Sequence, residues 1–482
     1  MITADLCVVG SGAGGAMVAR EAARAGLKVV VIEEGPSLPT SSMNQREDDM
    51  LPRLFFDGGG RTTADGAVTV LHGRGLGGST VHNTNLCKRA PELVLAKWAI
   101  DGWSARDLAP HYEVVERDLS VSRIEEHRIN RNNALLRLGC ERLGWQGAVL
   151  HHNRKGCVGS GFCELGCAFD AKQNASKVLI PDAIEHGCNV LTDHRADALI
   201  IERGRVVGVR ASHGGATVEV RASVCLSASA IGSALLARRS RLPDPSGKLG
   251  RTLHLHPGAA VAGVFDDPVE AFTGIPQSYE CTELLDLSGN DPDKRAWIVP
   301  AFAHPIGMAA MLPGFGAAHM RTMRLYPRLA VFVAMLHDES EGEVAVDGAR
   351  PKIKYELTRG DAHALLQGMR GAARLLFAAG ARKVIVPFAR ALELDSANDL
   401  DRIITHRYRP LDPVLAAVHP MGTLPLGTVV DERGAYRGVD GLWVADGSLF
   451  PTSIGGPPQL TIYAAGHKVA GHIVDSLGKK GT

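Results

Sequence analysis

Residues 6–35 read LCVVGSGAGGAMVAREAARAGLKVVVIEEG, and this segment carries the strongest structural signal in the chain. Residues 6–9 are apolar and typical of a short buried strand, and the β-branched run 28–32 predicts a second one. Residues 16–25, between them, contain no helix breaker. The pattern therefore predicts a strand, a glycine-rich turn, a helix and a second strand that is closed by Glu33.

The glycines of this turn follow the spacing G-x-G-x-x-G. In that motif Gly10 permits the tight turn, Gly12 lets the backbone approach a pyrophosphate, and Gly15 lets the helix pack on the strand. The free N–H groups of the helix N-terminus face the phosphates. Glu33 lies 18 residues beyond Gly15, where a carboxylate accepts hydrogen bonds from an adenosine ribose. We predict a dinucleotide site; the alternative is a glycine-rich turn without a ligand, and the motif alone does not separate FAD from NAD.

Composition narrows the class of protein. The 482 residues suffice for two to four units with their own cores. A net charge of +1 gives no general electrostatic reason to bind nucleic acid. No apolar run reaches the length of a transmembrane helix, and the N-terminus shows no basic region or cleavage site. We therefore expect a cytoplasmic protein without a transmembrane segment, or a periplasmic one only if a partner subunit carries it.

A second glycine-dense segment, HGRGLGGSTVHN, occupies residues 72–83. Adjacent glycines and small hydroxyl residues allow a backbone to lie flat against a large planar ligand. The segment resembles a motif of the glucose–methanol–choline (GMC) oxidoreductases, which bind FAD. Further motifs similar to those of this family follow in order: LSASAIGS (226–233), GRTLHLHP (250–257), HPMGT (419–423), GLWVADGSLFP (441–451) and PQLTI (458–462). The resemblance covers nearly the whole chain and implies FAD as the cofactor.

The resemblance also implies an architecture. The fold class would be α/β, with a discontinuous Rossmann-like FAD-binding domain and an α+β substrate-binding domain of the GMC type. The FAD-binding domain would comprise residues 1–95, 172–260 and 421–482, and the substrate-binding domain residues 96–171 and 261–420. The residue patterns agree in part: they predict a helix over 177–187, a strand over 189–192, a hairpin from 198–201 and 206–210, and a long helix over 361–379.

Site residues follow from the same resemblance. In this family, FAD takes a hydride from an alcohol carbon while a base removes the hydroxyl proton. His419 stands where the family carries its catalytic histidine, and imidazole suits this role because its ordinary pKa lies near neutral pH; the alternative is a buried structural histidine. Cofactor contacts are expected from Gly10, Gly12, Gly15, Glu33, Arg74, Gly77, Gly78, Ser79, His82, Asn83, Ala196, Asp446, Gly447, Pro458 and Gln459.

Pro457 departs from the family pattern. Relatives usually place Asn or His at this position, where it donates a hydrogen bond to the substrate oxygen, but a proline side chain can neither donate nor accept. Either another residue supplies the donor, or the oxygen needs only His419, or the reaction is not a simple alcohol oxidation.

His82 also departs from the common family pattern. The family commonly has an aliphatic residue before Asn83, whereas choline oxidase-like members have a histidine there that carries FAD covalently. The resemblance to that branch implies a histidyl–flavin bond at His82, which would raise the flavin potential. The alternative is a non-covalent histidine that packs near the flavin edge.

Three cysteines, Cys157, Cys163 and Cys167, follow a C-x5-C-x3-C spacing between glycines. Three thiolates in glycine-rich turns can hold an iron–sulfur cluster, and the segment resembles that of FAD-dependent glucose dehydrogenases with a three-iron cluster. It also resembles a cysteine-rich segment of long-chain alcohol and cholesterol oxidase relatives, in which Ser160 would replace a cysteine. Reduced structural thiols, or one disulfide with one free thiol, are the alternatives, and the missing fourth ligand counts against zinc.

The resemblance therefore implies an FAD-dependent oxidoreductase that oxidises a CH–OH group of an alcohol, sugar or sterol-like substrate. Pro457 keeps open a GMC-fold lyase of the hydroxynitrile type, in which the flavin is not reduced. A flavin-binding subunit of an electron-transfer complex is the other alternative. The expected partners are a small-molecule substrate and, in that last case, a small subunit or an electron-acceptor protein.

Overall fold

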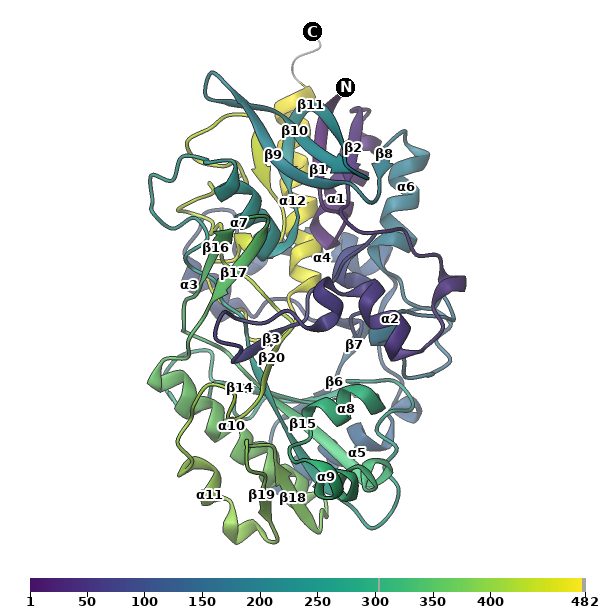
Figure 1. Cartoon of the computed structure of the whole chain (residues 1–482), viewed down its shortest axis with the longest axis vertical. Helices are drawn as coiled ribbons and strands as arrows, with labels where there is room; N and C mark the ends of the chain where they lie inside the picture. The colour runs from purple at the N-terminus through teal and green to yellow at the C-terminus, as the bar shows by residue number, and fades with distance from the viewer. Residues whose placement is uncertain (302–303, 479–482) are drawn as a thin grey trace.

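Two β-sheets organise the chain, one in each half of the molecule (Figure 1). The computed structural model describes residues 1–301 and 304–478. The first sheet lies in the half that holds both chain ends in Figure 1. Its order is β8 (Asn189–Leu191), β2 (Val29–Ile32), β1 (Ile2–Val9), β11 (Ala216–Leu226), β10 (Arg205–His213) and β9 (Arg195–Glu202), and β21 (Leu442–Val444) also pairs with β11.

The first sheet is parallel around the predicted nucleotide loop. Strand β1 pairs in parallel with β2 and β11, and β21 extends this parallel region, whereas β9, β10 and β11 form an antiparallel meander. Strand β2 is buried at all four positions, as its continuous β-branched sequence predicts for a central parallel strand. The fold class, α/β with a Rossmann-like unit, is confirmed.

Helices cover this sheet. Helix α1 (Ala13–Arg24) follows the glycine-rich turn and packs against α6 (Ile180–Glu185) and the last helix, α12 (Gln459–Gly478). Helix α12 also packs against α4 (Ala105–Asp118), and α7 (Ser229–Arg239) packs against β9. The approach of α12 to α1 is close, because a Cβ atom at Gly466 would lie 2.9 Å from the Gly14 carbonyl oxygen. Helices from the N-terminal and C-terminal parts of the sequence thus pack against each other in one layer.

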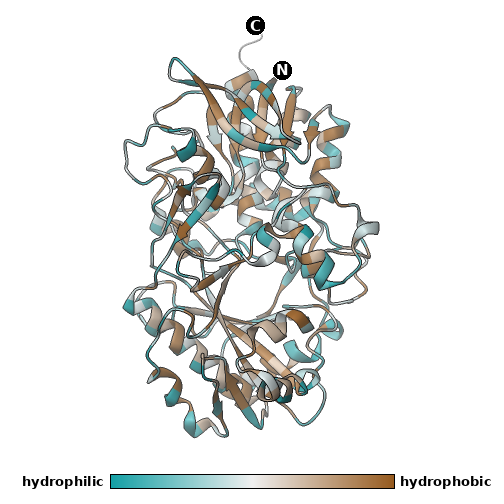
Figure 2. Cartoon of the chain, in the orientation of Figure 1, coloured by the Kyte–Doolittle hydropathy of each residue, from teal (hydrophilic) through white to brown (hydrophobic). Residues whose placement is uncertain are grey.

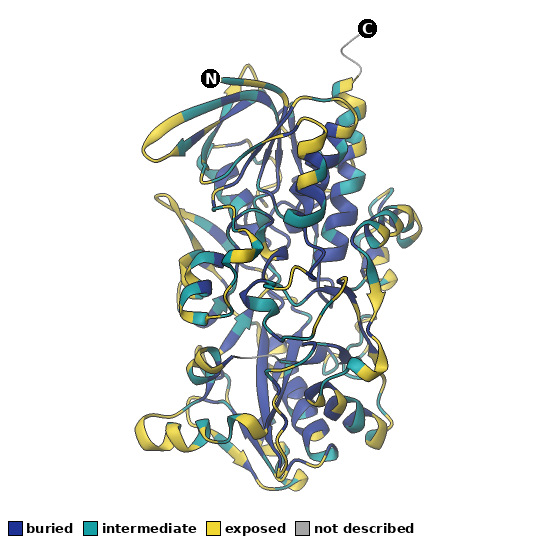
Figure 3. Cartoon of the chain, turned by 90° about the vertical axis from the view of Figure 1, so that its right-hand side faces the viewer, coloured by how far each residue is buried: buried dark blue, intermediate teal, exposed yellow. Residues whose placement is uncertain are grey.

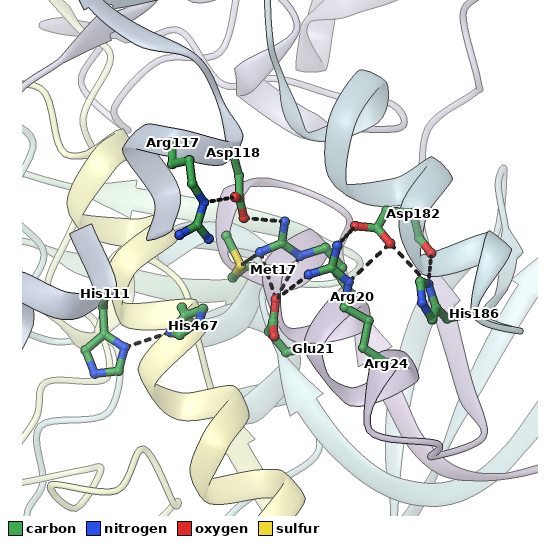
Figure 4. Close-up of polar contacts among 10 residues, drawn as sticks. All are labelled: Met17, Arg20, Glu21, Arg24, His111, Arg117, Asp118, Asp182, His186 and His467. Atoms are coloured by element: carbon green, nitrogen blue, oxygen red, sulfur yellow. Dashed lines mark hydrogen bonds and ion pairs between the residues drawn. The ribbon is translucent and has the colours of Figure 1, made fainter. Parts of the chain in front are cut away.

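A polar network fixes these helices to one another (Figure 4). The buried Arg20 of α1 donates hydrogen bonds to Asp118 of α4 and to Glu21, both at 2.8 Å. His111 of α4 and His467 of α12 lie 2.7 Å apart between their Nδ1 atoms. Burial of an unpaired guanidinium would be costly, so the pairing of Arg20 with Asp118 favours this packing of α1 against α4.

The second sheet builds the other half of the molecule. Its order is β19 (Leu392–Leu394), β18 (Lys383–Val386), β12 (Gly258–Val264), β15 (Leu329–Leu336), β14 (Ala296–Pro300), β13 (Tyr279–Cys281) and β6 (Gly147–Val149), with β20 (Leu415–Ala417) joining β12 to β3 (Val68–Val70). Helices α10 (Arg359–Ala378) and α5 (Arg131–Leu143) pack on one face. Figures 2 and 3 show that the central strands are mostly hydrophobic and buried.

The predicted elements are found close to their expected places. The long helix appears as α10, whose Thr358 side chain accepts from the Asp361 N–H at 3.1 Å and caps the first turn. The helix expected over 177–187 is a π-turn, Ala175–Leu179, followed by α6. The hairpin is β9–β10. The domain boundaries stay a prediction: β3 lies in the first predicted segment yet pairs in the second sheet, because its partner is β20.

The remaining elements are short, and some of them line the cavity described below. They include the hairpin of β16 (Glu343–Asp347) and β17 (Arg350–Lys354), the small sheet of β4 (Leu86–Cys87), β7 (His151–Asn153) and β5 (Val121–Arg123), and the helices α2 (Glu47–Leu54), α3 (Glu92–Trp98), α8 (Pro305–Met311), α9 (Gly316–Met323) and α11 (Asp401–Ile404). No helix in the described part of the chain is long and apolar enough to cross a membrane.

Candidate active site at the junction of the two sheets

A cavity of about 1060 Å³ receives side chains from both halves of the molecule. It brings together fourteen of the sixteen residues predicted to bind the cofactor or act as the base, and Pro457 with them. They are Gly10, Gly12, Glu33, Arg74, Gly78, Ser79, His82, Asn83, Ala196, His419, Asp446, Gly447, Pro458 and Gln459. The other two, Gly15 and Gly77, are not among the residues that line the cavity.

The glycine-rich turn has the geometry expected of a dinucleotide site. Gly10 has φ of +98°, a left-handed conformation that other residues rarely adopt. A Cβ atom at Gly15 would lie 2.0 Å from the Gly10 carbonyl oxygen, so glycine is required for packing. Gly12 is different: its φ of −66° suits any residue, and no described atom lies within 4 Å of a Cβ placed there. A ligand in the cavity would explain a glycine at this position, so the loop fits a dinucleotide.

Glu33 fixes this turn as well as lining the cavity. One carboxylate oxygen accepts from the Ser11 N–H at 3.1 Å and the Ser11 hydroxyl at 2.6 Å. The other accepts from the N–H groups of Gly35 at 2.9 Å and Gly75 at 3.3 Å. Burial raises the pKa of Glu33, and these four donors oppose that shift. The carboxylate therefore ties the two glycine-rich segments together, and a ribose hydroxyl would share its acceptor sites.

His82 lies in the second glycine-rich segment. Its ring lies 3.9 Å from the Phe55 ring, between centroids, and burial lowers its pKa to about 3. The buried ammonium of Lys172 donates to the carbonyl oxygens of Val81, at 2.9 Å, and of Asn83, on either side of His82. Among the described residues, His82 Nε2 has no hydrogen-bond partner. A neutral imidazole with an uncommitted nitrogen is thus held at the wall of the cavity.

His419 faces the cavity from the loop after β20 and pairs with a second histidine. Its Nδ1 lies 2.8 Å from Nδ1 of His256, and the two rings stack with centroids 5.1 Å apart. Burial lowers the pKa of His419 to about 3 and that of His256 well below its ordinary range. His256 itself has φ of +51°, and Asp338 accepts from its backbone N–H at 3.2 Å. Both imidazoles are therefore neutral at pH 7.

The C-terminal motifs complete the wall. Asp446 is buried and accepts from the Ser233 hydroxyl at 2.5 Å and the Ser448 N–H at 2.8 Å. Asn83 donates to the Gln459 side-chain oxygen at 2.7 Å, which aligns both amides along the cavity. Pro457 also lines the cavity and adds no donor.

The cysteines lie outside this cavity. Cys157, Cys163 and Cys167 border a separate hollow of about 20 Å³, together with Lys172. Burial raises the pKa of Cys163 to about 11, and in the structure all three thiols are free. Within residues 1–301 and 304–478, no three metal-ligating side chains converge closely enough to hold an ion. The iron–sulfur cluster stays a prediction.

Sequence reasoning missed His256, which belongs to the HLHP segment 163 residues before His419 in the chain. It also missed the row of small residues Gly258, Ala260 and Ala262 on β12, which lines the same cavity. The alternation of these residues with Ala259, Val261 and Gly263 is a period-2 signal, but all seven residues of the strand are small and apolar, so the inner face is not distinguishable from the outer one.

Comparison with known proteins indicates the family of this chain. Family models described as GMC oxidoreductase match residues 51–258 and 338–466, and a model of an NAD(P)-binding Rossmann-like domain matches residues 8–72. An uncharacterized GMC-type oxidoreductase of Mycobacterium tuberculosis is 35% identical over 98% of this chain and 76% of its own length. A long-chain-alcohol oxidase of Arabidopsis thaliana is 28% identical over 99% of this chain and 68% of its own.

Solved structures show the same fold. Pyridoxine 4-oxidase from Mesorbium loti superposes with a TM-score of 0.73 at 17% identity, over 97% of this chain and 98% of its own. A formate oxidase variant from Aspergillus oryzae superposes with a TM-score of 0.75 at 16% identity, over 98% of each chain. The motif order, the two-sheet fold and the relative from M. tuberculosis together show that this chain belongs to the GMC oxidoreductases.

Proposed function

We propose that the protein is an FAD-dependent alcohol oxidoreductase that oxidises a CH–OH group, with His419 as the base. The observation that carries this proposal is the His419–His256 pair: His419 lines the cavity that the nucleotide loop also lines, and His256 contacts it from behind. Bound FAD would supply the two-electron acceptor for the hydride that leaves the alcohol carbon. The residues of the chain must hold the alcohol and remove its hydroxyl proton.

The short distance between the two rings limits the protonation states open to the pair. Two nitrogens 2.8 Å apart share one proton, so one imidazole donates and the other accepts. For His419 to take the hydroxyl proton on Nε2, its Nδ1 must carry the shared proton and donate it to His256. His256 then carries its own proton on Nε2, which is buried and has no partner among the described residues.

This arrangement makes His256 a positioning residue. It orients the His419 ring with Nε2 toward the cavity, as a carboxylate does in other enzymes. Burial makes the imidazolium form of His419 costly, and the lone pair of His256 Nδ1 offsets that cost when the proton arrives. Because Pro457 contributes no donor, orientation and proton removal both depend on His419 and its partner.

The nucleotide would be held by the loop Gly10–Gly15, by Glu33 and by the segment around His82. Support comes from the open space at Gly12 and from the convergence of the predicted residues on one cavity. Covalent attachment at His82 and a cluster at Cys157, Cys163 and Cys167 are finer proposals, and each can fail without the other.

The test is anaerobic stopped-flow measurement of flavin bleaching near 450 nm with a panel of alcohols. His419→Ala should bind FAD normally and reduce it about 10²–10⁴-fold more slowly, as expected when a general base is removed. His363→Ala is the matched control, because this exposed histidine of α10 lies outside the cavity. A near wild-type rate for His419→Ala would refute the role of the base. Cleavage of a cyanohydrin without bleaching would favour the lyase alternative.

A further inference from the structure

The cavity extends from the histidine pair along strand β12. The residues Gly258, Ala260 and Ala262 of this strand line the cavity, and the alternate ones lie on the side of α10, where a Cβ atom at Gly263 would lie 2.8 Å from Leu376. His256 lies just before the strand, and Ala416 of β20 pairs with Gly258, which places His419 near the start of β12. At a rise of about 3.3 Å per residue, the wall runs about 13 Å from Gly258 to Ala262.

The surroundings of this strand are apolar, and β15 and β18 flank it in the same sheet. Val331 and Val333 of β15, Ile385 of β18, and Met308 and Leu312 of α8 and the turn after it line the same space. They form a buried cluster with Ala260 and Ala262 that is separate from the main core. Of the described residues between 258 and 335 that line the cavity, none is Asp, Glu, Lys or Arg.

Most polar groups on this side have partners. Glu47 of α2, which also lines the cavity, accepts from the N–H groups of Ile306 at 2.7 Å and Gly307 at 2.9 Å at the start of α8. Gln277 accepts a hydrogen bond from the Thr84 hydroxyl through its side-chain oxygen. The Trp297 indole N–H donates to Glu280 at 2.5 Å. His304 stacks on Phe162, with ring centroids 4.2 Å apart, and burial lowers its pKa to about 4, which keeps it uncharged at pH 7.

We infer that this part of the cavity is a hydrocarbon chamber, and that the substrate is an uncharged alcohol whose hydroxyl lies at His419 and whose apolar body lies along β12. The inference rests on the proposed function and narrows it to one substrate class. Ala260 and Ala262 determine specificity, because their small side chains keep the chamber open at two depths. A sugar does not fit this wall: each buried hydroxyl without a partner would weaken binding by about 5- to 150-fold.

The test compares primary alcohols from ethanol to 1-dodecanol with glucose and choline, by the rate of anaerobic flavin reduction on the purified holoenzyme. Burial of one methylene group should raise kcat/KM about fourfold, until the chain reaches the level of Ala262. Ala262→Phe should move this plateau to shorter alcohols, with a loss of about tenfold or more for 1-decanol, and Ala260→Phe should move it further. In the milder variant Ala262→Leu, the loss for 1-decanol should again exceed the loss for ethanol.

Ala345→Phe is the matched control, since this half-buried alanine of hairpin β16–β17 lies outside the cavity. A second readout does not need turnover: 1-decanol should raise the Tm of the wild type and of Ala345→Phe, and much less that of Ala262→Phe.

The outcomes separate the two proposals. Equal rates for 1-decanol, ethanol and glucose would overturn the chamber and leave the alcohol oxidoreductase standing. No flavin reduction by any alcohol, with a Tm shift that Ala262→Phe abolishes, would overturn the proposed function and support the chamber. Absence of both rate and Tm shift with 1-decanol would overturn the chamber itself.

Discussion

Gly12→Val tests the nucleotide site without knowledge of the substrate. The backbone at Gly12 is already in a conformation open to valine, and a Cβ atom there meets no described atom within 4 Å. The substitution should therefore leave the fold intact while the two methyl groups occupy the path of the pyrophosphate. Gly14→Ala should instead destabilise the fold, because its Cβ would lie 1.6 Å from the Ala445 carbonyl oxygen.

The magnitude follows from the contacts that the phosphates would lose. The first N–H groups of α1 have no partner within the helix, and a hydrogen bond to a charged group contributes about 1.5–3 kcal/mol. Loss of two such bonds amounts to about 3–6 kcal/mol, so the Kd for FAD should rise about 10²–10⁴-fold.

The assay is titration of apoprotein with FAD, followed by flavin fluorescence, beside the Tm of each apoprotein. Gly471→Val, at an exposed and open position of α12, should match the wild type in both measurements. Wild-type affinity in Gly12→Val would refute the assignment of this loop to the cofactor. A folded Gly14→Ala apoprotein with wild-type Tm would refute the packing argument.

Three further predictions address the cofactor chemistry and the buried histidines. Flavin should remain on the polypeptide after acid precipitation of the wild type and leave with the supernatant in His82→Ala, whose non-covalent flavin should have a lower potential; complete release from the wild type would contradict the bond. Anaerobically prepared protein should contain iron that the triple substitution of Cys157, Cys163 and Cys167 by Ser removes, and iron well below one atom per wild-type chain would end that idea. Burial lowers the pKa of His72, His82, His152 and His419 from 6.5 to about 3, so below pH 6.5 the unfolded chain binds protons that the folded chain does not. The free energy of unfolding in urea should thus be steady above pH 6.5 and fall towards pH 3, and equal values at pH 7.5 and 5 would contradict this sign.

Local sequence patterns predicted the nucleotide-binding half of the protein well. The run of residues 29–32 favours a buried strand, because β-branched residues at every position suit a parallel strand that is covered on both faces. The glycine spacing then sets the turn, since Gly10 needs a left-handed conformation and Gly15 a close packing distance. These requirements are local, because they depend on residues that are close together in the sequence.

The reactive centre was only partly predictable, because it depends on pairing between distant segments. His419 was found through its motif, but the pairing of β20 with β12 brings it to His256, and no local pattern encodes that contact. The substrate side was harder still, because strand β12 consists of small apolar residues on both faces. Its inner face is identified only once α10 covers the other one.

The packing of helix α12 on α1 has a consequence for biosynthesis. Residues Gly10–Gly14 and Ile462 of α12 line the same cavity, and α12 covers α1 through the close approach of Gly466 to Gly14. A ribosome releases the first strand and helix long before the last one. We therefore expect cofactor loading to wait until α12 has been synthesised, so a nascent chain that stalls before α12 should lack flavin and expose the apolar surface of α1 to chaperones.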